Sequence, residues 1–351
     1  MLKNLEVLGE FLLAVLAIDL NLSQARLDLI LKVYPSLKHA VDDEFKLFSN
    51  FYTHQKLKKS QEDLNSQTAL LEEEYSKSQN SITKPWLSKI QNYNWNELNG
   101  KISTLEQSLT KNDISLLPYK DFPKSIQDLT DCPCLLYYQG NLECFDLRKN
   151  IAVVGSRQIS TYSTRVLESI MPELTHADLG IVSGLALGVD SLAHRQSLNT
   201  NSKCIAFIGS GLDDTSFYPS QNKFLKQEIL ENNGLVCSEY SPGFKSMPYT
   251  FPRRNRFVAS LSDITWVIQA SVKSGALITA KMALDFGKIV ATTPSSIFDI
   301  SFDGNLQLIK DGAQIVSQAS DLFSLLNLTI SVAKIPNLSQ NIDWSLFSST
   351  A

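Results

Sequence analysis

Short runs of apolar residues alternate with longer segments of mixed polarity between residues 151 and 293. The runs IAVVG, LGIVSG, KCIAFIG, GLVCSEY, ITWVIQA and IVATTP have the length and continuity of buried strands. Helical spacing marks the segments around 163–174, 190–198 and 221–232, and the segment ITAKMALDFG. Strands that alternate with helices in this way predict an α/β domain with a mostly parallel sheet and helices on both faces.

The pattern differs on either side of this region. Residues 1–115 carry helical spacing with few β-branched runs, which predicts a small all-α N-terminal domain. Prolines and short apolar runs follow from 115 and read as a linker into a first strand, CLLYYQG. We therefore expect a helical domain at 1–115, the α/β domain at 116–320 and a short C-terminal tail at 321–351.

Composition narrows the classes of partner. The chain has 351 residues, 43% of them hydrophobic and 19% charged, with a formal net charge of −4. Binding to nucleic acid would therefore need a local basic patch rather than a globally positive surface. The most apolar early stretch, FLLAVLAIDL, is too short to span a bilayer, so no membrane association is expected.

Cysteine and histidine usage indicates a cytoplasmic protein without a metal. The five cysteines are odd in number and form no C-x-x-C motif, which favours buried reduced thiols. The four histidines form no cluster with the spacing of metal ligands, so we expect no metal site.

Small residues recur where predicted strands meet predicted helices. These junctions are Gly155-Ser156-Arg157, Ser183-Gly184, Gly209-Ser210-Gly211, and Ser274-Gly275 with Thr279 just beyond. Glycine lets a ligand approach the backbone, and free N–H groups at a helix start attract anions. One such junction is explained by a tight turn and an N-cap, but four at one sheet edge predict a single anion-binding crevice. G-x-G-x-x-G and Walker A motifs are absent, so no nucleotide cofactor is expected.

The most basic short run is FPRRNRF at 251–257, with Arg253, Arg254 and Arg256 around Asn255. Arginine forks suit phosphate oxygens, and the alternatives are a solvated charged loop or an arginine paired to a core acid such as Asp263. The run lies after an aromatic–proline pair and before a predicted buried strand, which indicates a partly buried, fixed position. Asp190 and His194 lie one helical turn apart, where a cap and a packed histidine are favoured over a catalytic pair. No nucleophile stands beside them, which indicates that the protein is not an enzyme.

Ordered motifs across 115–315 resemble the DprA/Smf family of DNA-processing proteins. The matching segments are DFPKSIQDLTDCPCLLYYQGN, VVGSR, SGLALGVDSLAH, GSGLD with Tyr218-Pro219, SEY, FPRRNR, SGALITA and GNLQLI followed by GA. The resemblance implies an extended Rossmann-like domain that binds single-stranded DNA and delivers it to the RecA recombinase. It also implies a homodimer that acts in natural transformation and recombination. The winged-helix-like C-terminal domain of many members is not expected in the 321–351 tail.

The resemblance places Arg157, Lys223 and the RRNR arginines in the DNA site. Together with the crevice residues, the predicted nucleic-acid-binding set is Gly155, Ser156, Arg157, Ser183, Gly184, Lys223, Arg253, Arg254, Asn255, Arg256, Ser274, Gly275 and Thr279. Leu187 stands where the family often has a basic residue, and Gln269 replaces a usual glutamate.

Two features frame the alternatives. Residues 151–315 carry 14 basic and 14 acidic side chains, so a cationic groove requires that the arginines cluster in space. Phe217, Tyr218, Phe251 and Phe257 are candidates for stacking on bases, and at least two of them are expected in the core.

The alternative to DNA binding is a nucleotide-binding enzyme of a related Rossmann-like family, such as a nucleotide-sugar hydrolase. Such an enzyme would need a catalytic carboxylate beside a glycine-rich phosphate loop, and Gln269 and Ser295 weaken that interpretation.

Overall fold

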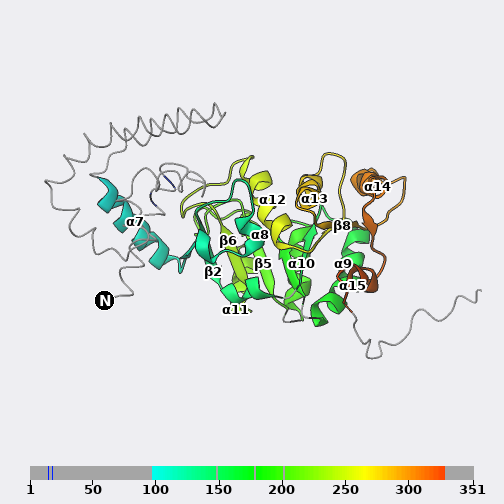
Figure 1. Cartoon of the computed structure of the whole chain (residues 1–351), viewed down its shortest axis with the longest axis horizontal. Helices are drawn as coiled ribbons and strands as arrows, with labels where there is room; N and C mark the ends of the chain where they lie inside the picture. Colours follow the sequence, from blue (N-terminus) through cyan, green and yellow to red (C-terminus); the bar gives the residue numbers. More distant parts are fainter. Residues whose placement is uncertain are drawn as a thin grey trace, which may run out of the picture.

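The computed structural model describes residues 97–328, except 148, 178 and 201, together with residues 15 and 18 (Figure 1). The helices expected over most of 1–96, and the tail from 329 onward, lie outside these described residues. Helix α7 (Leu98–Lys111) lies where the sequence predicts helical structure. The domain boundaries at 115 and 320 stay predictions.

A single sheet organises the described part of the chain. Its strands are β1 (Ser115–Pro118), β2 (Leu135–Gly140), β3 (Asn150–Val154), β4 (Gly180–Ser183), β5 (Cys204–Ile208), β6 (Leu235–Ser238), β7 (Ile264–Val267), β8 (Ile289–Thr292) and β9 (Gln314–Ile315). They lie in the order β1-β2-β6-β5-β4-β3-β7-β8-β9. The pairs β1–β2 and β2–β6 are antiparallel, and every other neighbouring pair is parallel. The predicted α/β class with a mostly parallel sheet is confirmed.

Helices cover both faces of the sheet (Figure 1). They are α8 (Lys124–Gln127), α9 (Thr161–His176), α10 (Val189–Leu198), α11 (Lys223–Glu231), α12 (Thr250–Leu261), α13 (Gly275–Asp285), α14 (Asp303–Lys310) and α15 (Ala319–Leu325). Successive β3 side chains alternate between two apolar cores, because side chains along a strand point to opposite faces. Ala152 and Val154 pack with α12 and α13, whereas Ile151 and Val153 pack with α9, α10 and α15.

The structure adds two elements that the sequence analysis did not predict. The expected linker contains β1, an edge strand that pairs only with β2. The run FPRRNRF, considered from sequence as partly buried or as a solvated loop, lies within α12. Pro252 fits there because it lies in the first helical turn, where backbone N–H groups have no intrahelical partner.

Within the described residues, no helix is both long enough and apolar enough to cross a bilayer. The same residues include no group of three or more histidine, cysteine, aspartate or glutamate side chains arranged to hold a metal ion. All five cysteines are buried.

Candidate functional site

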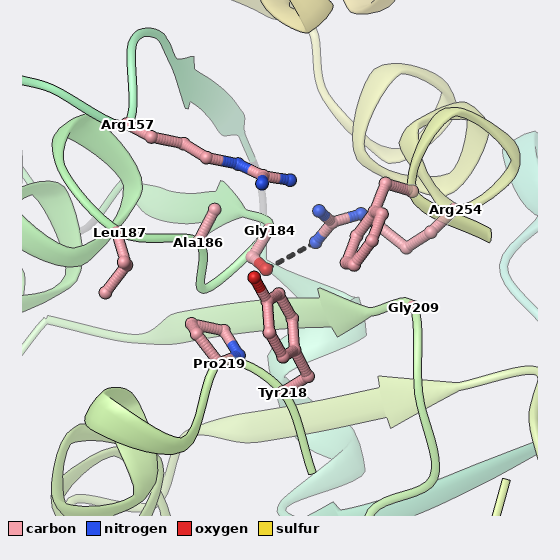
Figure 2. Close-up of a pocket in the computed structure, with 9 residues that line it drawn as sticks. Arg157, Gly184, Ala186, Leu187, Gly209, Tyr218, Pro219 and Arg254 are labelled. Atoms are coloured by element: carbon pink, nitrogen blue, oxygen red, sulfur yellow. Dashed lines mark hydrogen bonds between the residues drawn. The ribbon is translucent and has the colours of Figure 1, made fainter. Parts of the chain in front are cut away.

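A shallow, open hollow lies at the carboxyl ends of β3, β4 and β5 (Figure 2). Its lining residues are Arg157, Gly184, Ala186, Leu187, Gly209, Tyr218, Pro219, Phe251 and Arg254. The carboxyl edge of a parallel sheet is the usual place for ligands in α/β folds. Three of the four predicted strand junctions, those at 155–157, 183–184 and 209–211, contribute to it through Arg157, Gly184 and Gly209.

Arg157 follows β3 and projects over the hollow from one side (Figure 2). Its guanidinium carbon lies 5.1 Å from the centroid of the Phe251 ring, within cation–π range. The side chain is exposed, and none of the described acidic residues forms an ion pair with it. Arg157 therefore presents an uncompensated positive charge to a ligand.

Arg254 enters the hollow from α12 and is only 5% exposed. Its Nη1 donates hydrogen bonds to the carbonyl oxygens of Gly184 and Phe207, and its Nε donates to Oδ1 of Asn255 at 3.1 Å. Burial lowers the pKa of Arg254 to about 10, with attraction to Asp190 opposing the shift and repulsion from Arg157 adding to it. The guanidinium thus remains charged at neutral pH and forms a second fixed cation beside Arg157.

Apolar and aromatic side chains form the rest of the wall. The rings of Tyr218 and Phe251 lie 5.5 Å apart between centroids, at an interplanar angle of 55°. Tyr218 is 42% exposed, whereas Phe217 and Phe257 are buried in the core, as expected for two of the four aromatic candidates. Two cations beside accessible aromatic rings can bind an anion that carries a flat apolar group.

The predicted residues around the first two junctions have structural contacts close to the hollow. A Cβ on Gly155 would lie 2.6 Å from Val189, so only glycine allows β3 and α10 to approach this closely. Ser156 donates its N–H to the Gln269 carbonyl at 2.8 Å, and the Ser183 hydroxyl donates to the Val153 carbonyl at 2.6 Å. These residues shape the sheet edge from which Arg157 projects, but they are not part of the lining.

The RRNR arginines divide into two groups. Arg254 lines the hollow, with Asn255 as its hydrogen-bond acceptor. Arg253 and Arg256 instead pair with Glu239, at 2.9 Å from Arg253 Nε and 2.5 Å from Arg256 Nη2. Arg256 also contacts Asp131 at 3.0 Å. Two of the three arginines are therefore paired to a core acid, and that acid is Glu239. Asp263, the acid considered from sequence, instead pairs with Lys149.

The fourth junction lies elsewhere on the sheet edge. Ser274 is the N-cap of α13, Gly275 begins that helix and Thr279 is buried in it, and none of them lines the hollow. Strand β7, which leads into this junction, lies on the opposite side of β3 from β4. Lys223 begins α11, is half-buried and is likewise outside the lining.

Several lining residues were missing from the predicted set. Ala186, Pro219 and Leu187 are apolar, so a search for phosphate-binding residues passes over them. Their positions inside the motif segments SGLALG and YPS were the available signal. Leu187, noted only as a departure from a basic residue, lies in the wall itself (Figure 2).

Comparisons with known proteins agree with this architecture. The family model for DNA recombination-mediator protein A matches residues 114–327. DNA processing protein DprA of Streptococcus pneumoniae is 41% identical over 203 residues, which are 58% of this chain and 70% of that protein. Protein Smf of Borreliella burgdorferi is 34% identical over 289 residues, which are 82% of this chain and 84% of that protein.

Two solved structures share the fold. The X-ray structure of DprA from Streptococcus pneumoniae has a TM-score of 0.58 and 33% identity, and covers 72% of this chain and 90% of its own. A structure reported for the single-stranded DNA binding mode of DNA processing protein A from Helicobacter pylori has a TM-score of 0.55 and 32% identity. It covers 61% of this chain and 95% of its own.

Proposed function

The chain belongs to the DNA recombination-mediator protein A family of DNA-processing proteins, and on this premise we propose that it binds single-stranded DNA in the hollow at the ends of β3, β4 and β5. The observation that carries the proposal is the convergence of Arg157 and Arg254 beside Tyr218 and Phe251. The Helicobacter pylori relative, whose structure was reported with its single-stranded DNA binding mode, supports the same ligand.

The chemistry of the wall favours single strands over duplex. Arg157 and Arg254 supply positive charge for a phosphate, and Tyr218 and Phe251 supply rings on which a base can stack. A base has to leave its own stack to reach such rings, and a single strand loses less stacking and pairing energy than a duplex when that happens. Sequence preference is expected to be weak, because every base has a flat face.

Arg157→Ala tests the proposal directly. The change removes one phosphate contact, so affinity for a labelled oligothymidine should fall and the slope of log K against log salt should drop by about 0.7. Fluorescence anisotropy across a salt series measures both. Arg195→Ala is the matched control, because Arg195 is also exposed but pairs with Glu228 at 3.6 Å outside the hollow. Unchanged affinity and slope in a folded Arg157→Ala protein would remove the hollow from the binding site.

We propose further that the protein acts by binding rather than by hydrolysis. Two carboxylates in the segments that follow β4 and β5 already accept several hydrogen bonds: Asp190 accepts from two backbone N–H groups, and Asp213 accepts from Ser216, Thr215 and Gly243. Purified protein incubated with single-stranded DNA or nucleotides should release no product. Hydrolysis that disappears in Arg157→Ala would instead support the nucleotide-hydrolase alternative.

Family membership supports the remaining parts of the proposal: a cytoplasmic homodimer that delivers single strands to the RecA recombinase during transformation and recombination. Apolar side chains stand exposed in the segment that follows β8, namely Ile297 at 73%, Phe298 at 89% and Ile300 at 79%, and we assign this segment to the dimer face. Light scattering should report a dimer, and Phe298→Ser should weaken it. A monomeric wild-type protein would contradict the homodimer.

The ATPase activity of RecA on single-stranded DNA coated with this protein measures delivery. A mixture without ATPase activity would contradict delivery to RecA.

A further inference from the structure

The loop that follows β4 has a backbone conformation that needs support. Residues 184–187 supply Gly184, Ala186 and Leu187 to the wall of the hollow (Figure 2). Between them, Leu185 is fully buried and has a φ of 53°, in the left-handed region that non-glycine residues rarely adopt. A residue held in this region costs of order 1–3 kcal/mol, so surrounding contacts have to maintain it.

The side chain of Asp190 accepts hydrogen bonds from backbone N–H groups of this loop. Its Oδ2 accepts hydrogen bonds from the backbone N–H of Gly184 at 3.0 Å and of Ala186 at 3.4 Å. The side chain lies in the first turn of α10, is 6% exposed, and is absent from the lining of the hollow. The carboxylate therefore accepts from the backbone N–H groups of the two residues that flank Leu185, and it does not line the ligand space.

Side chains from two other elements hold the carbonyl side of the same loop. Asn222 donates from Nδ2 to the carbonyl oxygens of Leu185 at 2.9 Å and Ala186 at 3.2 Å. Arg254 donates to the carbonyl of Gly184 from α12. The loop is thus fixed from both sides by buried polar groups, and Asp190 is the acceptor for its N–H groups.

Resting on the proposed function, we propose that Asp190 is a positioning residue that controls affinity for single-stranded DNA. It does so by keeping the 184–187 loop in the binding conformation, without touching the strand. If the loop is released, only a fraction of the molecules has the wall in place. The apparent dissociation constant rises by the inverse of that fraction.

Charge alone predicts the opposite sign. Burial raises the pKa of Asp190, whereas the charge of Arg254 and the hydrogen bonds from Gly184 and Ala186 oppose that shift. When Asp190 is ionised, its field opposes the binding of a phosphate near Arg254. If Asp190 acted only through its charge, removing it would tighten DNA binding. If it acts by holding the loop, removing it weakens binding although the hollow has become more positive.

The test uses full-length Asp190→Ala and Asp190→Asn with a labelled oligothymidine across a salt series. We expect Asp190→Ala to bind about tenfold more weakly, as it would if about a tenth of the molecules kept the loop in place. Asp190→Asn, which retains one acceptor oxygen, should lie between it and the wild type. The salt slope should stay unchanged, because no phosphate contact is lost. Asp263→Asn is the matched control: Asp263 accepts from Lys149 and from the Asn150 N–H at the opposite end of the strands, so its loss should leave affinity intact.

Tighter binding or unchanged affinity in folded variants would overturn the proposal, and so would a salt slope reduced as in Arg157→Ala. If Asp190→Ala does not fold, Asp190→Asn decides by the same criteria. Amide hydrogen exchange at Gly184 and Ala186 separates this proposal from the proposed function, because faster exchange in the Asp190 variants reports the released loop without DNA. A wild-type protein that does not bind single strands would contradict the DNA function, whereas unchanged exchange would contradict the role of Asp190.

Discussion

Replacing Glu239 by glutamine should destabilise the fold by about 3 kcal/mol and leave DNA affinity unchanged. Glu239 pairs with Arg253 and Arg256, the two arginines of the RRNR run that do not line the hollow. The variant therefore tests whether these arginines stabilise the fold or bind DNA. A structural role predicts a loss of stability alone, and a DNA role predicts a change in salt dependence.

The magnitude follows from burial. The side chains of Glu239 and Arg256 are each 5% exposed, so breaking the pair leaves a buried guanidinium without its main anion. Burial lowers the pKa of Arg256, but attraction from Glu239 outweighs it and the pKa is raised overall. Asp131 remains 3.0 Å away with a side chain that is 57% exposed, and its screened charge compensates only in part. The loss should thus fall at the lower end of the roughly 3–5 kcal/mol typical of a broken buried pair.

Urea unfolding followed by circular dichroism measures the change, and thermal unfolding should show a Tm lower by about 6–12 °C. Replacing both partners by apolar residues, Glu239→Leu with Arg256→Met, should recover most of the stability, because no buried charge is left alone. A Glu239→Gln protein within about 1 kcal/mol of the wild type would refute the reasoning, since that is the range of an exposed pair. A changed salt slope in DNA binding would show that Arg253 or Arg256 contacts the strand.

Two further predictions concern Asp213 and Leu187. Burial raises the pKa of Asp213, but hydrogen bonds from Ser216, Thr215 and Gly243 outweigh it and lower the pKa to about 2. Since the folded pKa lies below the reference value of 3.8, this carboxylate stabilises the fold above about pH 4, and the contribution is lost as the pH falls towards 2. Urea unfolding should therefore show that the stability deficit of Asp213→Asn shrinks between pH 5 and pH 2, and a constant deficit would contradict this. Leu187→Lys places a cation in the wall of the hollow and should tighten binding at low salt, with a salt slope steeper by about 0.7; an unchanged slope would show that the strand passes elsewhere.

Strands β3 to β8 were predictable from sequence because each is almost wholly buried and reads as a continuous apolar run, whereas the parallel strand β9 is exposed and was not predicted. Strand β3 shows this clearly, with all five of its residues buried. β1 escaped prediction because SLLP is short, ends in proline and pairs on one side only, as edge strands do. α12 was not among the helices predicted from sequence, although the run FPRRNRF lies within it.

The parts of the site that sequence could not predict depend on contacts between distant segments. Arg256 of α12 is buried rather than solvated because it pairs with Glu239, which directly follows β6 and is distant from Arg256 in the sequence. Whether the Ser274-Gly275 junction joins the hollow is decided by strand order, which places β7 beyond β3. Arg157 was predictable because its position depends on local chain geometry alone: it follows the strand tip directly.

The close approach of Gly184 to Arg254 constrains how this protein can change over time. A Cβ on Gly184 would lie 2.2 Å from Nη1 of Arg254, whose guanidinium is fixed by the Gly184 and Phe207 carbonyls. Any side chain at position 184 therefore displaces the Arg254 guanidinium from the hollow, and a smaller residue at position 254 would make room only by removing that cation. The two positions, 70 residues apart in the chain, must be inherited as a pair. A library that varies one of them while holding the other will return mostly proteins without the second cation.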